Sequence, residues 1–148
     1  MKIELRGQAF DPWQELQQAE AALRNNDSGQ FGASCVFVGT MRDLNEGTSV
    51  SRMFLEHYPE MAQQHLQSIA AEAIDKWRLL SVLMIHRVGY IEPNDNIVLL
   101  AVWSAHRDAA FKACRYLIEE LKHRAPFWKK ETLSSNLERW VTKNTPDQ

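Results

Sequence analysis

This sequence of 148 residues has only two cysteines, Cys35 and Cys114, and neither belongs to a CxxC motif or to a cluster with histidine. A secreted domain held together by disulfides needs more cysteines, and a zinc site needs ligands at closer spacing. Both cysteines stand among apolar neighbours, which favours inert thiols in the core over a reactive pair. The sequence therefore predicts neither a disulfide framework nor a zinc site.

Long apolar runs, phosphate-binding glycine motifs and a strong net charge are also missing. No apolar stretch approaches the roughly 20 residues that span a bilayer, and the charged start Met-Lys-Ile-Glu-Leu-Arg is unlike a signal peptide. Neither a GxGxxG motif nor a P-loop is present, so nothing points to a dinucleotide or a nucleoside triphosphate. With a net charge of −2, no overall field draws the chain to nucleic acid. We expect a cytoplasmic protein whose anion sites, if any, are local patches.

Three helices are predicted from start signals and apolar spacing. Asp11-Pro12 begins the first, which ends near Asn25, because aspartate caps a helix and proline fits its first position. Pro59 begins the second, and its apolar positions recur at helical spacing as far as Trp77. The third spans about residues 107–124.

Strands are predicted around residues 3–5, 31–41, 50–58, 79–88, 97–104 and 127–133, with a polar loop over 43–49. Turn residues at 93–96 favour a hairpin or meander between the fourth and fifth strands. Neighbouring strands with no helix between them indicate an α+β domain over residues 1–148, with an antiparallel or mixed sheet covered by about three helices. The polar tail from about residue 142 is expected to be mobile.

A basic segment with an aromatic centre, residues 121–131, is the first candidate site. Lys122 falls in the last turn of the third helix, where the helix dipole favours a cation by about 0.3–1 kcal/mol, so spacing alone favours a solvated basic face. Phe127 and Trp128 should pack beside these lysines, however, and both desolvation and a nearby cation lower a lysine pKa. Lys129 and Lys130 are adjacent in a strand, so only one of them can share a site with Lys122.

Two His-Arg dipeptides form the second candidate. His106-Arg107 stands where a strand becomes the third helix, and free N–H groups with an arginine there suit a phosphate or carboxylate. An ion pair of Arg107 with Asp108 or another surface acid, beside a partly buried His106, explains the same residues equally well. His86-Arg87, near the end of a strand, is more simply interpreted as structural.

Arg42 is the third candidate, in Gly39-Thr40-Met41-Arg42-Asp43 at the end of a buried strand. An arginine at that place can reach a ligand from a loop. The alternative is a salt bridge that anchors the loop, formed with Asp43 or Glu46.

Five motifs in order resemble the large, catalytic subunit of molybdopterin synthase, over roughly residues 30 to 140. They are Gly39–Asp43, Leu55-Glu56-His57-Tyr58 with Met61, Ile85–Gly89, Ser104–Arg107 and Leu121–Glu131. The segments before residue 30 and after residue 140 show no motif that can be matched. The resemblance implies the α+β, hammerhead-like fold of that family.

The resemblance also implies a sulfurtransferase of molybdenum cofactor biosynthesis. The family converts cyclic pyranopterin monophosphate (precursor Z) to the molybdopterin dithiolene. A small ubiquitin-like subunit supplies the sulfur as a thiocarboxylate on its C-terminal glycine. The family assembles as a heterotetramer around a dimer of large subunits, and no metal or redox cofactor is called for.

Family roles carry over to matching positions. Lys122 matches a pocket lysine beside the thiocarboxylate tail, and Lys129 matches a second essential lysine. Arg42, His106 and Arg107 match residues that bind the phosphate and pterin of the substrate. The resemblance further suggests that Phe37 and Pro126 line the channel for the tail.

Two other functions fit the same basic residues. A non-catalytic module that binds anions, such as RNA or a phosphorylated partner, would show an extended basic stripe with exposed aromatic residues. A hydrolase that acts on a cyclic phosphate would need no partner protein.

Overall fold

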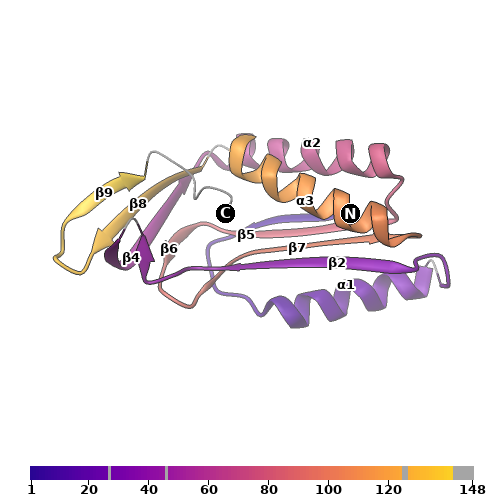
Figure 1. Cartoon of the computed structure of the whole chain (residues 1–148), viewed down its shortest axis with the longest axis horizontal. Coiled ribbons are helices and arrows are strands. Elements are labelled where there is room, and N and C mark those ends of the chain that lie inside the picture. The colour runs from indigo at the N-terminus through magenta and orange to yellow at the C-terminus, as the bar shows by residue number, and fades with distance from the viewer. Residues whose placement is uncertain (27, 46, 125–126, 142–148) are drawn as a thin grey trace.

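Helices cover both faces of a central sheet in the computed structural model, which describes residues 1–26, 28–45, 47–124 and 127–141 (Figure 1). In chain order the elements are β1 (Lys2–Arg6), α1 (Pro12–Asn26), β2 (Ala33–Thr40), β3 (Leu44–Asn45), β4 (Thr48–His57), α2 (Pro59–Trp77), β5 (Ser81–Arg87), β6 (Gly89–Ile91), β7 (Asn96–Ser104), α3 (Arg107–Arg124), β8 (Phe127–Leu133) and β9 (Glu138–Val141). Within those residues, no helix is both long and apolar enough to cross a membrane.

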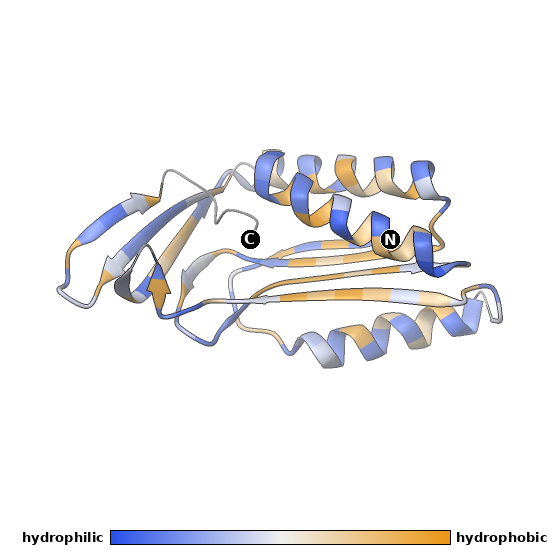
Figure 2. Cartoon of the chain, in the orientation of Figure 1, coloured by the Kyte–Doolittle hydropathy of each residue, from blue (hydrophilic) through white to orange (hydrophobic). Residues whose placement is uncertain are grey.

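The central sheet has the strand order β1-β5-β7-β2. β1 runs parallel to β5, and the other neighbours are antiparallel, so the sheet is mixed. Because side chains alternate along a strand, Val82 and Met84 pack toward α2 and α3, whereas Leu83 and Ile85 pack toward α1. Figure 2 shows the result: apolar residues fill the strands, and polar residues lie on the outer sides of the helices.

A second sheet lies beyond one end of the first and contains β3, β4, β6, β8 and β9 (Figure 1, left). Its inner face has an apolar cluster of its own, in which Met53, Leu55 and Ile91 pack against Val88, just past the end of β5. The two sheets therefore meet where β5 and β2 end, and this junction positions the site described below.

The predicted α+β class, the three helices and the pairing of residues 79–88 with 97–104 are confirmed. Asp11 caps α1, since its Oδ1 accepts hydrogen bonds from the backbone N–H groups of Trp13 and Gln14 at 2.9 and 3.3 Å. The loop predicted over 43–49 is wrong, because β3 and the start of β4 form a small hairpin there. β6 and β9 were not predicted, nor was the division into two sheets. The predicted mobile tail from residue 142 lies outside the described residues.

Of the two cysteines predicted as core thiols, Cys114 is buried and Cys35 is partly buried. Cys114 on α3 is buried, and burial together with the neighbouring Cys35 thiol raises its pKa to about 12. At neutral pH this thiol stays protonated and is a poor nucleophile.

At Gly32 the backbone lies close against the segment that leads into α3. Its N–H donates to the Ser104 carbonyl at 3.0 Å, and a Cβ on it would lie 2.5 Å from the Ala105 carbonyl oxygen. We expect Gly32→Ala to lower the free energy of unfolding by about 1–3 kcal/mol through this clash. Gly7→Ala is the matched control, because a Cβ there meets nothing within 4 Å. Equal urea midpoints for the two variants would contradict the close contact.

Candidate active site

A cavity of about 210 Å³ lies at the junction of the two sheets, beneath the C-terminal end of α3. Apolar side chains form most of its wall, and three side chains that carry nitrogen enter it: Lys122, Lys129 and His86. Phe37 also lines it, as expected for a channel residue. Pro126, the other residue expected in that channel, lies outside the described residues.

The alternation of β8 selects which lysine faces the cavity. Lys129 lies opposite Leu55 of β4, on the inner face, whereas Lys130 lies opposite Phe54, on the outer face. Lys130 forms an ion pair with Glu138 at 2.8 Å and lies over the ring of Trp140. The prediction that only one of the two adjacent lysines shares a site with Lys122 is confirmed.

The two aromatic residues of the basic segment separate in the same way. Phe127 faces inward and stacks on His86, with ring centroids 4.5 Å apart and planes 18° apart. Trp128 faces outward and packs edge-on against Tyr58, with centroids 5.4 Å apart. The expectation that both rings pack beside the lysines therefore holds for Phe127 only.

Lys129 sits in surroundings that favour its neutral amine. Burial lowers the pKa of the Lys129 ammonium and the charge of Lys122 lowers it further, while the Glu131 carboxylate opposes both. A lysine with a lowered pKa offers more free amine at neutral pH, as a nucleophile or a proton acceptor requires. The sequence predicted that lysines beside an apolar turn affect each other's pKa, and the structure bears this out for Lys129.

Glu131 holds the neighbouring loop in place and was not predicted as a site residue. Its carboxylate is only 4% exposed and accepts hydrogen bonds from Asn45 Nδ2 and Arg139 Nε, both at 3.0 Å. Arg139 Nη2 also donates to the Asn45 carbonyl at 2.9 Å. The sequence signal was available, because Glu131 occupies the same inward phase of β8 as Lys129.

Arg42 lies beside Lys129 in a smaller hollow of about 120 Å³, which Glu131 and Asn45 also line. The Glu131 bridge therefore also fixes the segment that carries Arg42. Within the described part of the chain, Arg42 forms no ion pair with Asp43, and Glu46 lies outside that part. The loop-anchoring alternative is therefore not supported for Asp43, and its form with Glu46 falls outside the described residues.

His86 contributes a neutral imidazole to the cavity wall. Its Nδ1 lies 2.7 Å from the Arg87 carbonyl oxygen, which only accepts, so Nδ1 carries the proton and Nε2 carries the lone pair. Burial lowers the pKa of His86 to about 4, against the hydrogen bond to Arg87 and together with the charges of Lys129 and His57. The structural interpretation suits Arg87, whose Nη2 donates to the Tyr90 carbonyl at 2.6 Å, but His86 faces the cavity.

His106 and Arg107 stand at the opposite end of α3. They line an open hollow with Gly32 and Asp108. Asp108 forms an ion pair with Lys112 at 2.9 Å, so the alternative pairing of Arg107 with Asp108 is not seen. Lys122 follows Arg107 by 15 positions on the same helix, which at 1.5 Å per residue places their Cα atoms about 22 Å apart. One chain therefore brings Lys122, Lys129, Arg42 and Phe37 together but leaves His106 and Arg107 remote.

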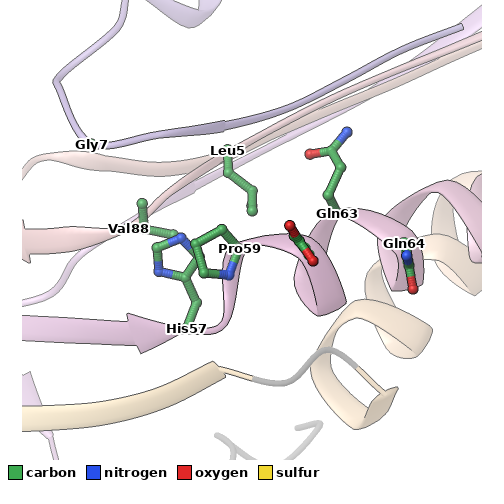
Figure 3. Close-up of a pocket in the computed structure, with 8 residues that line it drawn as sticks. Leu5, Gly7, His57, Pro59, Gln63, Gln64 and Val88 are labelled. Carbon is green, nitrogen blue, oxygen red and sulfur yellow. The ribbon is translucent and has the colours of Figure 1, made fainter.

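A larger hollow, of about 660 Å³, lies between the ends of β1 and β4 and the start of α2. Figure 3 shows His57 and Pro59 on one side of it, with Leu5 and Gln63 above. Among the residues that the structure describes, no lysine or arginine lines it, so the smaller cavity with the lysine pair is the better candidate for an anionic ligand.

The comparisons with known proteins show which family the chain belongs to. A family described as MoaE protein matches residues 10–124. The chain belongs to the MoaE family. It is 47% identical over 148 residues to the molybdopterin synthase catalytic subunit of Pseudomonas aeruginosa, covering 100% of this chain and 95% of that one. The family match begins at residue 10, whereas the motifs in the sequence indicated a resemblance only from about residue 30.

Solved structures with the MoaE fold match nearly the whole chain. The molybdopterin biosynthesis MoaE protein of Burkholderia ambifaria is 43% identical, with a TM-score of 0.78 over 99% of this chain and 92% of that one. A complex of subunits 1 and 2 of the molybdopterin-converting factor of Helicobacter pylori shares the fold, at 21% identity, a TM-score of 0.79, and coverage of 97% and 92%.

The neutral, buried His86 predicts a specific dependence of stability on pH. The pKa of His86 is about 4 in the folded chain and 6.5 in the unfolded chain. Between pH 4 and pH 6.5, therefore, the unfolded chain carries a proton on this imidazole and the folded chain does not. Stability is therefore lost as pH falls through that window, by about 2 kcal/mol between pH 7 and pH 5 for this residue.

Urea unfolding of His86→Phe at the two pH values measures this contribution. The free energy of unfolding of the wild type should fall by about 2 kcal/mol more than that of His86→Phe. His123→Gln, which changes an exposed histidine, should behave as the wild type. Parallel pH profiles for the wild type and His86→Phe would show that His86 titrates normally.

Proposed function

We propose that this chain is the catalytic subunit of a molybdopterin synthase and transfers sulfur from a partner's C-terminal thiocarboxylate to precursor Z. The observation that carries the proposal is the pair of Lys122 and Lys129 in one largely apolar cavity of a MoaE-family chain. The relative from P. aeruginosa, 47% identical to this chain, is named a molybdopterin synthase catalytic subunit. We place the reaction in the cytoplasm.

The cavity suits a narrow anionic tail. Its apolar wall accepts an extended peptide end, and Lys122 supplies a cation for the thiocarboxylate. Lys129, whose pKa burial and the charge of Lys122 lower, supplies a share of free amine next to the reacting carbon. After sulfur has left, the tail remains as a carboxylate or as an acyl-lysine, and an amine is competent for either outcome. His86 adds a proton acceptor without adding charge.

The substrate is a cyclic phosphate and needs several cations around it. Of the three predicted substrate-binding residues, Arg42 is the one that lies beside Lys129 within a single chain. Since His106 and Arg107 are about 22 Å from Lys122 within the chain, they bind the phosphate and pterin only if a second copy contributes them. The active site is therefore built across a dimer of large subunits.

The sulfur donor is a small ubiquitin-like subunit that ends in a glycine thiocarboxylate. The H. pylori complex of two converting-factor subunits contains a chain with this fold, which supports such a pairing here. One small subunit at each cavity of the dimer gives a heterotetramer.

Two other functions account less well for the site. An anion-binding module would not bury a lysine and lower its pKa within an apolar cavity. A hydrolase for a cyclic phosphate would act without a partner, so turnover by the purified chain alone would favour it.

Reconstitution tests the proposed activity. The chain alone should be inert, and adding a thiocarboxylated small subunit with precursor Z should give the dithiolene product in mass spectra. Lys122→Ala and Lys129→Ala should each lower turnover by roughly 100-fold or more, because the tail loses its counter-ion or its amine. Lys130→Ala, on the outer face of β8, is the matched control and should keep wild-type turnover. The proposal fails if no dithiolene forms with all three components present.

Mixing two inactive variants tests the shared site. Lys122→Ala and Arg107→Ala chains, unfolded and refolded together, should recover about one quarter of wild-type activity. Random pairing makes half of the dimers mixed, and each mixed dimer has one site with both residues intact. No recovery, with mixed dimers verified by mass, would mean that each site uses residues of one chain only.

A further inference from the structure

Arg87 is a charged residue that lies almost entirely out of reach of water. It is the last residue of β5, and only 5% of it is exposed. Because side chains alternate along a strand, it lies on the face of the sheet opposite His86, which lines the cavity. A buried charge is unfavourable unless other groups pair with it and accept its hydrogen bonds. The contacts of Arg87 therefore indicate what keeps it in this position.

The guanidinium of Arg87 contacts both ends of the segment that joins β6 to β7. Its Nη2 donates to the Tyr90 carbonyl at 2.6 Å, and its Nη1 lies 4.0 Å from Oδ2 of Asp95, an ion-pair distance. Among the described residues, Nε and Nη1 have no hydrogen-bond acceptor. These two contacts therefore hold the side chain, and the planar fork of arginine suits them better than the single ammonium of lysine.

Asp95 closes this segment into a tight turn. Its N–H donates to the Glu92 carbonyl, and its Oδ2 accepts from the Glu92 N–H, both at 3.0 Å. Asn94, inside the turn, has a φ of 73°, in the left-handed region that asparagine enters more readily than most residues. The carboxylate that closes the turn is thus also the one that faces Arg87.

The same turn holds the backbone of Met41. The Met41 N–H donates to the Asp95 carbonyl, and the Met41 carbonyl accepts from the Asn94 N–H, both at 2.9 Å. In Figure 1 the turn between β6 and β7 lies beside the stretch where the chain leaves β2 for the second sheet. The Met41 side chain is buried in the apolar cluster of that sheet. Met41 is therefore fixed through both its backbone and its side chain.

Arg42 is the first residue beyond this pair of hydrogen bonds. The chain is fixed again at Asp43, whose carbonyl accepts from the Val50 N–H at 2.7 Å. Arg42 is exposed between the two fixed points and lines the hollow that Lys129 also lines. Ordering a free arginine on binding is unfavourable, so a fixed backbone favours binding by limiting the places that the guanidinium can reach.

We propose that Arg87 is a positioning residue for Arg42. Its guanidinium holds the turn at residues 92–95, the turn holds Met41, and the backbone of Met41 sets where Arg42 begins. Arg42 then lies beside Lys129, where it binds the phosphate of precursor Z. The proposal rests on the proposed function for what Arg42 binds, whereas the contacts that run from Arg87 to Met41, the clamp, are measured without activity. The alternative is that Arg87 serves the stability of the fold alone.

Hydrogen exchange of the Met41 amide, followed by NMR, tests the clamp. Arg87→Lys keeps the charge but loses the fork that reaches two acceptors. The Met41 amide should then exchange roughly 10-fold or more faster relative to the amides of β7, which report global unfolding. A Met41 rate that changes only in step with β7 would overturn the proposal, since that is the signature of lost stability alone.

Arg6→Lys is the matched control for this measurement. Arg6 lies opposite Arg87 in the pairing of β1 with β5, but its guanidinium bonds Glu4 and Glu15. The same substitution at this neighbouring position should leave the Met41 rate unchanged relative to β7.

Asp95→Asn tests the clamp from its other side and serves if Arg87→Lys does not fold. The amide oxygen of asparagine can still accept the Glu92 N–H, but the charge that faces Arg87 is gone. The Met41 amide should again exchange faster relative to β7. Wild-type exchange in Asp95→Asn would show that the ion pair holds nothing, and would overturn the proposal.

Kinetics with the thiocarboxylated small subunit separate positioning from stability. Arg87→Lys should raise KM for precursor Z roughly 10-fold and leave kcat within about two-fold, because a lost charged contact weakens ground state and transition state alike. In an Arg42→Ala background the same substitution should add nothing, since Arg87 acts through Arg42. Arg6→Lys should keep the wild-type KM.

Two kinetic outcomes bear on different claims. Effects of Arg87→Lys and Arg42→Ala on KM that multiply would overturn the positioning role, because the two residues would then act independently. A wild type that forms no dithiolene would reject the proposed function, and the exchange of the Met41 amide would still decide whether the clamp exists.

Discussion

The length of α3 is the constraint on which the function of this chain depends. The helix is held on the central sheet by a buried face of alanine, cysteine and leucine, so its two ends cannot approach each other. It carries His106 and Arg107 at its start and Lys122 in its last turn, about 22 Å apart. A small cyclic phosphate cannot contact both ends of one helix. A site that uses all of these cations therefore needs a second copy of the chain, and antiparallel helices are the arrangement that brings unlike ends together.

The second sheet contributes the second lysine of the cavity, Lys129, to the one that α3 carries. It places Lys129 in a buried position next to Lys122, and burial with the neighbouring charge lowers the pKa of the Lys129 ammonium. The Glu131 bridge to Asn45 and Arg139 ties β8 to β3 and β9 and so holds Arg42 beside the same lysine. His86 contributes a lone pair without a charge. The result is a cavity in which Lys122 lies beside Lys129, a lysine with a lowered pKa.

Much of this could be predicted from the sequence. The periodicity gave the three helices and β8, and alternation along β8 separated Lys129 from Lys130. β3, β6 and β9 are only two to four residues long, and their pairing depends on distant partners rather than on local pattern. His86 was interpreted as structural, because a single histidine in a strand does not reveal which cavity it faces. Glu131 was missed although it shares the inward phase of Lys129 on β8. The helix predicted over residues 107–124 already implied that His106 and Arg107 lie far from Lys122, although the family resemblance grouped them.

A crystal structure of the chain with its small subunit measures the central claim directly, through the distance from Arg107 of one copy to Lys122 of the other. We predict that the two residues border one cavity, far closer across the dimer than the roughly 22 Å that separates them along α3. A dimer in which Arg107 of the second copy is no nearer to Lys122 than that would contradict the account, because the cations of the site would then never meet.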